Sequence, residues 1–185
     1  MKKIVVSLTA LFLATSVYAD ENPFMGDYEN QIAINLGQGV NSGFLIPPPT
    51  QLVPFYLIDV RYSQPTTFFK LPARQSISIA QTLGFGEKYG WQWDQYTIPL
   101  IYLSEDIALF YGCDWYFSAG IGVGLQGKQN ERLGAKLLFQ FKLIGGYKIN
   151  EQTSVELFVQ HFSNANTAEE NNSYAFYGIG MSYSF

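Results

Sequence analysis

Eight segments of this chain alternate between an apolar face and a small or polar face, and no other feature restricts the fold as strongly. Alternation with a period of two indicates β-strands, because successive side chains of a strand point to opposite sides. In chain order the segments are 31–37, 55–62, 76–85, 95–103, 115–126, 133–149, 153–163 and 173–185. The pattern predicts an all-β protein, although Pro99 inside the fourth segment cannot donate a ladder hydrogen bond.

One face of each segment carries hardly any charge. In segment 115–126 it comprises Trp115, Phe117, Ala119, Ile121, Val123 and Leu125. Charged side chains lie on the opposite faces, at Asp59, Arg61, Lys136, Lys142 and Glu156. Charged residues make up 14% of the sequence and aromatic residues 17%, whereas soluble domains average about 25% charged residues. This combination is typical of barrels of the bacterial outer membrane.

We therefore expect an eight-stranded antiparallel transmembrane β-barrel. Strand edges cannot stay unpaired in lipid, so the sheet must close, and eight strands make the smallest standard barrel. The lipid-facing set includes Ile121, Val123, Leu143, Val155 and Leu157. The lumen of such a small barrel is filled by side chains. The charges on the other face are therefore expected to pair inside the barrel instead of lining a pore.

Both ends of the chain carry signals for export. Lys2 and Lys3 precede an apolar stretch at 4–14, and Val17-Tyr18-Ala19 follows. This pattern predicts a signal peptide at 1–19 and a single barrel domain at 20–185. No later apolar run reaches the roughly 18–20 residues of a spanning helix. The final strand ends in Phe185, and it resembles the terminal strand by which the outer-membrane assembly machinery recognises its substrates.

Composition excludes two classes of protein. The net charge of −4 argues against nucleic acid as a partner. The single cysteine, Cys113, cannot form an internal disulfide framework.

The strand count also predicts an orientation. Both termini of an even-stranded barrel lie on the periplasmic side, so segment 153–163 should run outward to the cell surface. The extracellular connections would then be 38–54 (which contains Pro47-Pro48-Pro49), 86–94, 127–132 and 164–172.

The candidate chemistry lies at the outer end of segment 153–163. His161, the only histidine, and Ser163 are two residues apart, so they share the lipid-facing side of the strand. A neutral imidazole can take the serine proton as the hydroxyl attacks an ester, and can return it to the leaving alcohol. A lipid-facing pair of this kind favours an esterase whose substrate is a lipid.

These residues resemble the PagL-type lipid A 3-O-deacylases. The resemblance is carried by H-F-S-N-A at 161–165, a short Asn-rich loop, N-S-Y at 172–174 and a last strand ending in Phe. Segment S-Q-P-T-T-F-F-K-L-P at 63–72 also looks familial. The family consists of eight-stranded barrels that hydrolyse the ester-linked acyl chain at position 3 of lipid A. It implies His161 as base, Ser163 as nucleophile and no metal or cofactor, with the backbone amides of Asn164 and Asn166 as the oxyanion hole.

The third member of the triad departs from the family pattern. The family has a Glu immediately before the S-Y of the last strand, and this chain has Asn172 there. Outer-membrane phospholipases A use an Asn in this role, and a carbonyl oxygen can hold the histidine tautomer. We expect Asn172 to orient His161, with Glu170 or Glu169 from the loop as the alternatives.

Two other functions stay open at this point. One is a phospholipase-like acyl hydrolase, although that family has larger, calcium-dependent, twelve-stranded dimeric barrels. The other is a small structural or adhesive barrel without activity. Lys88, Lys128 and Arg132 lie in the predicted outer loops and could meet lipid A phosphates. A homodimer is compatible with the pattern.

Overall fold

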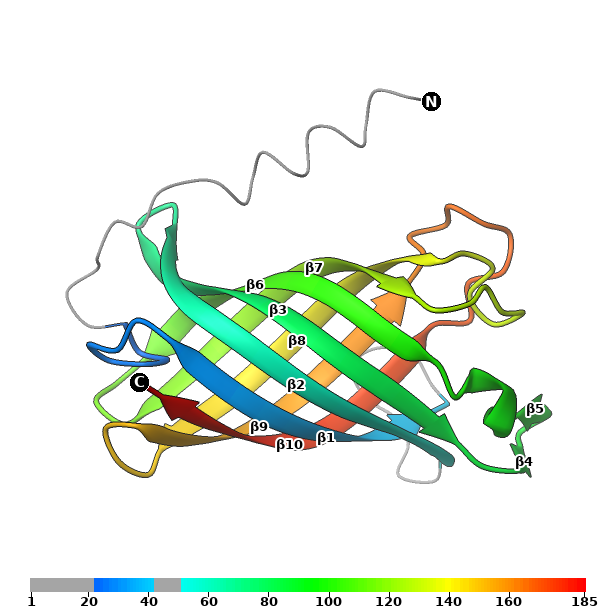
Figure 1. The fold of residues 1–185 in the computed structure, drawn as a ribbon, viewed down its shortest axis with the longest axis horizontal. Helices are drawn as coiled ribbons and strands as arrows, with labels where there is room; N and C mark the ends of the chain where they lie inside the picture. The colour runs from blue at the N-terminus through cyan, green and yellow to red at the C-terminus, as the bar shows by residue number, and fades with distance from the viewer. Residues whose placement is uncertain (1–21, 42–50) are drawn as a thin grey trace.

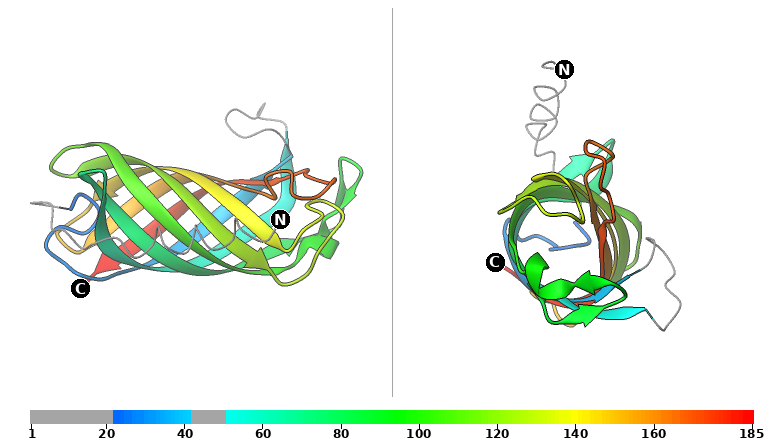
Figure 2. Two further views of the ribbon diagram at one scale, coloured as in Figure 1. Left: turned by 90° about the horizontal axis from the view of Figure 1, so that it is seen from above. Right: turned by 90° about the vertical axis from the view of Figure 1, so that its right-hand side faces the viewer.

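The computed structural model describes residues 22–41 and 51–185, so the predicted signal peptide and the Pro47-Pro48-Pro49 segment lie outside the described residues. Eight antiparallel strands of the described chain form one closed barrel, in the order β1-β10-β9-β8-β7-β6-β3-β2 (Figures 1 and 2). They are β1 (Gln31–Val40), β2 (Leu52–Phe68), β3 (Leu71–Gly84), β6 (Pro99–Tyr111), β7 (Trp115–Gln126), β8 (Leu137–Lys148), β9 (Thr153–Ser163) and β10 (Tyr174–Ser184). The predicted fold class is confirmed.

The two ends of the barrel differ. At one end, called the terminal end here, lie the C-terminus and the short turns at 69–70, 112–114 and 149–152 (Figure 1). At the other, called the loop end, lie the second loop (85–98), the third loop (127–136) and the fourth loop (164–173). The second loop contains β4 (Glu87–Lys88), β5 (Trp91–Gln92) and the 3₁₀ helix η2 (Trp93–Tyr96). No helix among the described residues is long and apolar enough to cross a membrane.

Burial follows the predicted alternation on most strands. In β1, Ile32, Ile34 and Leu36 are exposed on the outer wall while Ala33 and Asn35 are buried in the lumen. In β9, Leu157 is 64% exposed and its neighbours Glu156 and Phe158 are buried. The exposed apolar residues form the wall that a barrel of this kind turns to lipid.

The predicted segment 95–103 has the wrong start, and the apolar set that alternation assigns to its outer face (Tyr96, Ile98, Leu100 and Tyr102) is buried. The strand begins at Pro99, and Tyr96 belongs to η2. Leu100 and Tyr102 are buried in the lumen, whereas Ile101 is exposed on the outer wall. Periodicity failed here because both faces of this strand are apolar. Pro99 is tolerated because it is the first residue of the strand.

Segment 133–149 also begins later than predicted, at Leu137. Residues 130–134 form a tight turn instead, with the Gly134 amide donating to the Asn130 carbonyl at 2.8 Å. Gly134 has a φ of +61°, which suits glycine and stops the strand. The prediction that Lys136 faces the lumen is therefore wrong: it is exposed and directly precedes Leu137, the first residue of β8.

Paired charges cross the middle of the lumen. Glu156 of β9 accepts from Arg61 at 2.9 Å and from Arg74 at 2.6 Å. Asp106 lies 3.0 Å from Arg74 and 3.3 Å from Lys142. All five side chains are almost fully buried. The prediction that Lys142, Glu156 and Arg61 face the lumen is confirmed, and the pairs tie together strands from opposite sides of the barrel.

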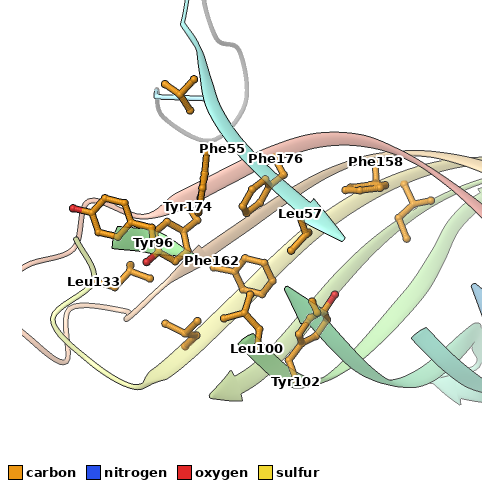
Figure 3. Close-up of a cluster of buried hydrophobic side chains, with 14 of the residues drawn as sticks. Phe55, Leu57, Tyr96, Leu100, Tyr102, Leu133, Phe158, Phe162, Tyr174 and Phe176 are labelled. Atoms are coloured by element: carbon orange, nitrogen blue, oxygen red, sulfur yellow. The ribbon is translucent and has the colours of Figure 1, made fainter. Parts of the chain in front are cut away.

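Aromatic side chains fill the lumen near the loop end (Figure 3). Phe55 lies 5.2 Å from Tyr174 and 5.1 Å from Phe176 between ring centroids. Phe162 of β9 packs against Tyr102 at 5.4 Å. This cluster lies on the lumen side of the last residues of β9, so it supports that strand from behind.

Candidate active site

His161 and Ser163 lie at the loop end of β9, on its outward face. Phe162 between them points into the aromatic cluster and is 1% exposed, which directs its two neighbours to the outer wall. Both are partly exposed. His161 lies opposite Phe141 of β8 and Ala175 of β10, and Ser163 lies opposite Phe139. The pair is thus set in an apolar surface, as hydrolysis of a lipid would require.

The fourth loop turns away from β9 directly after the serine. Ala165 and Asn166 both have positive φ values, of 51° and 60°. Asparagine adopts this conformation more readily than most residues. The carbonyl of Asn164 accepts from the amide and the hydroxyl of Thr167, at 3.1 and 2.7 Å, which closes the turn.

The side chain of Asn164 is completely buried and holds the loop together. Its Nδ2 donates to the carbonyls of Leu133 and Glu170, both at 2.6 Å. Its Oδ1 accepts from the amide of Asn166 at 2.7 Å. One asparagine therefore connects the end of β9 to the third loop and to the far side of its own loop. The sequence analysis assigns a role only to the backbone amide of this residue. The four asparagines at 164, 166, 171 and 172 are the sequence feature that indicates a loop held by side-chain hydrogen bonds.

The two amides expected to form the oxyanion hole already have acceptors. The amide of Asn164 donates to Asn171 Oδ1 at 3.1 Å, and the amide of Asn166 donates to Asn164 Oδ1. Asn171 is also anchored to Asn166 through its Nδ2, at 2.9 Å. In this conformation both amides are therefore bound to side-chain carbonyls of the fourth loop.

The three candidates for the third triad member lie just before β10. Asn172, Glu169 and Glu170 are all exposed. Asn172 Nδ2 donates to the Glu170 carboxylate at 3.5 Å, and the Asn172 amide donates to the Arg132 carbonyl at 2.7 Å. Tyr174 pairs with Phe162, so these residues lie beside the end of β9 that carries Ser163.

The predicted loop cations differ in their surroundings. Lys88 is exposed and donates to the Leu52 carbonyl at 2.7 Å, and Lys128 is exposed in the third loop. Arg132 is 5% exposed and packs between Trp91 and Trp93. Its guanidinium is buried among protein groups, and the expectation that Arg132 meets lipid A phosphates stays a prediction. Lys136, which the sequence assigned to the lumen, is also exposed at the loop end.

The chain is similar to a known enzyme family and to several solved β-barrels. The family model described as lipid A 3-O-deacylase (PagL) matches residues 58–184. The crystal structure of the outer membrane enzyme PagL covers 84% of this chain and 99% of its own, at 15% identity and a TM-score of 0.62. Neisserial surface protein A covers 84% and 97%, at 6% identity and a TM-score of 0.57. A de novo designed transmembrane β-barrel covers 85% and 95%, at 7% identity and 0.52.

At these identities the structural matches establish the fold alone, and no curated protein matches the sequence. The family match is different in kind. It extends over most of the chain, from β2 to the end of β10, and it includes the strand with His161 and Ser163, the fourth loop and Asn172. The chain belongs to the lipid A 3-O-deacylase (PagL) family of outer-membrane β-barrels.

Proposed function

We propose that this protein is an outer-membrane serine esterase that hydrolyses the 3-O-acyl ester of lipid A, with His161 as base and Ser163 as nucleophile. The observation that supports it most directly is their position on the outward wall of β9, between Phe139 and Phe141 of β8 and Ala175 of β10. An acyl chain lying along this apolar wall would bring its ester to the hydroxyl without leaving the bilayer.

The reaction proceeds in two steps. Ser163 Oγ attacks the ester carbonyl carbon while His161 accepts the hydroxyl proton. His161 then passes that proton to the 3-oxygen of the sugar as the carbon–oxygen bond breaks, which leaves the acyl chain on Ser163. Water, deprotonated by His161, attacks this acyl-serine and releases the fatty acid, and the proton returns to Ser163.

The oxyanion of each step would replace Asn171 Oδ1 as the acceptor of the Asn164 amide. Only the exposed side of the loop has to change for this, because Asn171 is held by hydrogen bonds to Asn164 and Asn166 alone among those described for it. The Asn166 amide is harder to release. Its acceptor belongs to the buried Asn164 side chain, which two further hydrogen bonds hold in place.

We assign Asn172 as the residue that orients His161, with Glu170 or Glu169 as alternatives. The backbone of Asn172 is fixed because its amide donates to the Arg132 carbonyl. The backbone of Glu170 is held through its carbonyl, which accepts from Asn164 Nδ2 at 2.6 Å. A neutral carbonyl acceptor suffices to hold the tautomer, although it stabilises the imidazolium less than a carboxylate does.

The proposed orientation places the termini in the periplasm and the loop end at the outer leaflet, where lipid A resides. Lys88, Lys128 and Lys136 are exposed at that end and would attract its phosphates. In the same scheme the segment 1–19 directs export, and the strand ending in Phe185 recruits the assembly machinery.

Mass spectrometry of lipid A from cells that express the protein tests the function. The wild type should remove the one ester-linked acyl chain at position 3, while Ser163→Ala should leave lipid A intact. Thr153→Val is the matched control, because Thr153 lies on the same face at the other end of β9. Fatty acid released from phospholipid, with lipid A unchanged, would identify the phospholipase-like alternative. No hydrolysis of either lipid would favour the structural barrel.

A further inference from the structure

Arg132 is the most constrained cation at the loop end. Its guanidinium carbon lies 4.7 Å from the ring centroid of Trp91 and 4.8 Å from that of Trp93. Nε donates to the Ser173 carbonyl at 2.9 Å, and Nη2 donates to Asn41 Oδ1 at 3.3 Å. Arg132 thus joins its own loop to the first connection, the second loop and the start of β10.

The charge of Arg132 is retained despite its burial. Burial lowers its pKa to about 10, and at neutral pH the guanidinium is still protonated. A cation between two indole rings is stabilised by their π-electrons, with a gain that increases as water is excluded. Lysine could not replace it, because a compact ammonium lacks the flat faces and the fixed fork of donors.

The backbone around Arg132 forms a compact turn, called the Arg132 turn here (residues 130–134). Asn130 Oδ1 accepts from the amides of Arg132 and Leu133, at 3.0 and 3.1 Å. Asn130 Nδ2 donates to the hydroxyl of Tyr174 at 2.8 Å. The first residue of the turn is therefore tied to β10 through Tyr174.

The Arg132 turn is hydrogen-bonded to both ends of the fourth loop. The Leu133 carbonyl accepts from Asn164, the residue after the nucleophile, and the Arg132 carbonyl accepts from Asn172. Gly134 lies so close to this loop that a Cβ would be 2.9 Å from that of Ala168 and 3.0 Å from the Glu170 carbonyl. The proposed oxyanion donor and the proposed third triad member are thus placed by the neighbouring carbonyls of Leu133 and Arg132.

We propose that Arg132, clamped between Trp91 and Trp93, is a positioning residue for the Ser163 site. It touches no reacting atom in this scheme. It fixes the turn that sets the distance between the Ser163–Asn164 end and the Asn172 end of the fourth loop. The proposal rests on the proposed serine mechanism, and it adds that the second and third loops are required for that mechanism to operate at full rate.

The loss of catalytic rate expected on replacing Arg132 can be estimated from the displacement of the catalytic groups. A displacement of about 1 Å in a catalytic group can cost on the order of 100-fold in rate. Arg132→Met should therefore lower kcat for lipid A by about that factor. KM should change little, because the apolar wall that would bind the acyl chain is built from β8, β9 and β10.

A covalent probe separates this proposal from the serine mechanism itself. An alkyl fluorophosphonate in detergent micelles should label wild-type protein at Ser163. Arg132→Met should be labelled on the order of 100-fold more slowly while still migrating as a folded barrel on unheated gels. Glu131→Gln, an exposed neighbour in the same turn, is the control and should react like wild type.

Further variants keep the test decisive if Arg132→Met assembles poorly. Trp91→Ala should slow labelling and Trp91→Phe should restore it, since only an aromatic face can stack on the guanidinium. Arg132→Ala should regain activity with guanidinium ion at a non-denaturing concentration and not with ammonium. Wild-type labelling rates in both the Arg132 and Trp91→Ala variants would overturn the positioning role. Absence of labelling in the wild type would overturn the serine mechanism and this role together.

Discussion

The two halves of β9 have different partners and, we infer, different tasks. The half near the terminal end presents Glu156 to the lumen, where Arg61 and Arg74 pair with it. The half near the loop end presents Phe162 to the aromatic cluster, with His161 and Ser163 on the other side. Charge pairs close the middle of the barrel, while rigid rings support the strand that carries the site. Substitutions near the middle of β9 should therefore change mainly the stability of the barrel, and substitutions at its loop end mainly the rate of catalysis.

The largest expected effect lies at the loop end. Ser163→Ala and His161→Ala should each lower the rate of deacylation by on the order of 10⁴–10⁶-fold, and the double variant should be little worse, since triad members act as a unit. Unfolding by urea in lipid vesicles should be nearly unchanged for all three. A large loss of stability in Ser163→Ala would break the separation proposed for β9.

Asn172→Ala should come next, with a loss of about 10²–10⁴-fold in kcat, because His161 would lose the acceptor that holds its tautomer. Glu169→Ala and Glu170→Ala serve as controls and should retain most activity. Asn172→Glu should stay active, since a carboxylate accepts the same hydrogen bond. Inactive Glu170→Ala together with active Asn172→Ala would transfer the role to the loop carboxylate.

The reverse pattern is expected at Glu156. Glu156→Ala removes one of the two carboxylates that pair with the buried Arg61, Arg74 and Lys142, which leaves Asp106, and should destabilise the barrel by about 3–5 kcal/mol. The fraction that does fold should deacylate at close to the wild-type rate, because Glu156 lies seven residues before Ser163 along β9 and faces the lumen. Equilibrium unfolding in vesicles measures the first effect and an active-site titration measures the second.

A smaller loss of stability should follow from Leu157→Arg on the outer wall. Leu157 is 64% exposed there, and a charge placed toward lipid costs about 2–4 kcal/mol near the midplane. Leu157→Val is the matched control and should differ little from wild type. An unchanged unfolding midpoint for Leu157→Arg would contradict the assignment of this face to lipid.

Period-two alternation was sufficient to predict the barrel. It gave the bounds of β7 and β9 as the structure has them, because small or polar residues outnumber aromatic ones on the lumen side of each strand. It failed for β6, where Leu100 and Tyr102 belong to the aromatic cluster and make both faces apolar. Alternation identifies a lipid-facing side only when the lumen side looks different.

The sequence by itself determined the outward face of β9 and the placement of His161 and Ser163 on that one face. Both follow from the spacing of residues along a single strand, and that spacing can be read directly from the sequence. Only the tertiary structure decided that Arg132 is buried between Trp91 and Trp93, and that Asn164 bridges the third and fourth loops. Those contacts join residues that are far apart in the chain. Closure of the barrel brings the loops together at one end, and no local pattern records which of their side chains then meet.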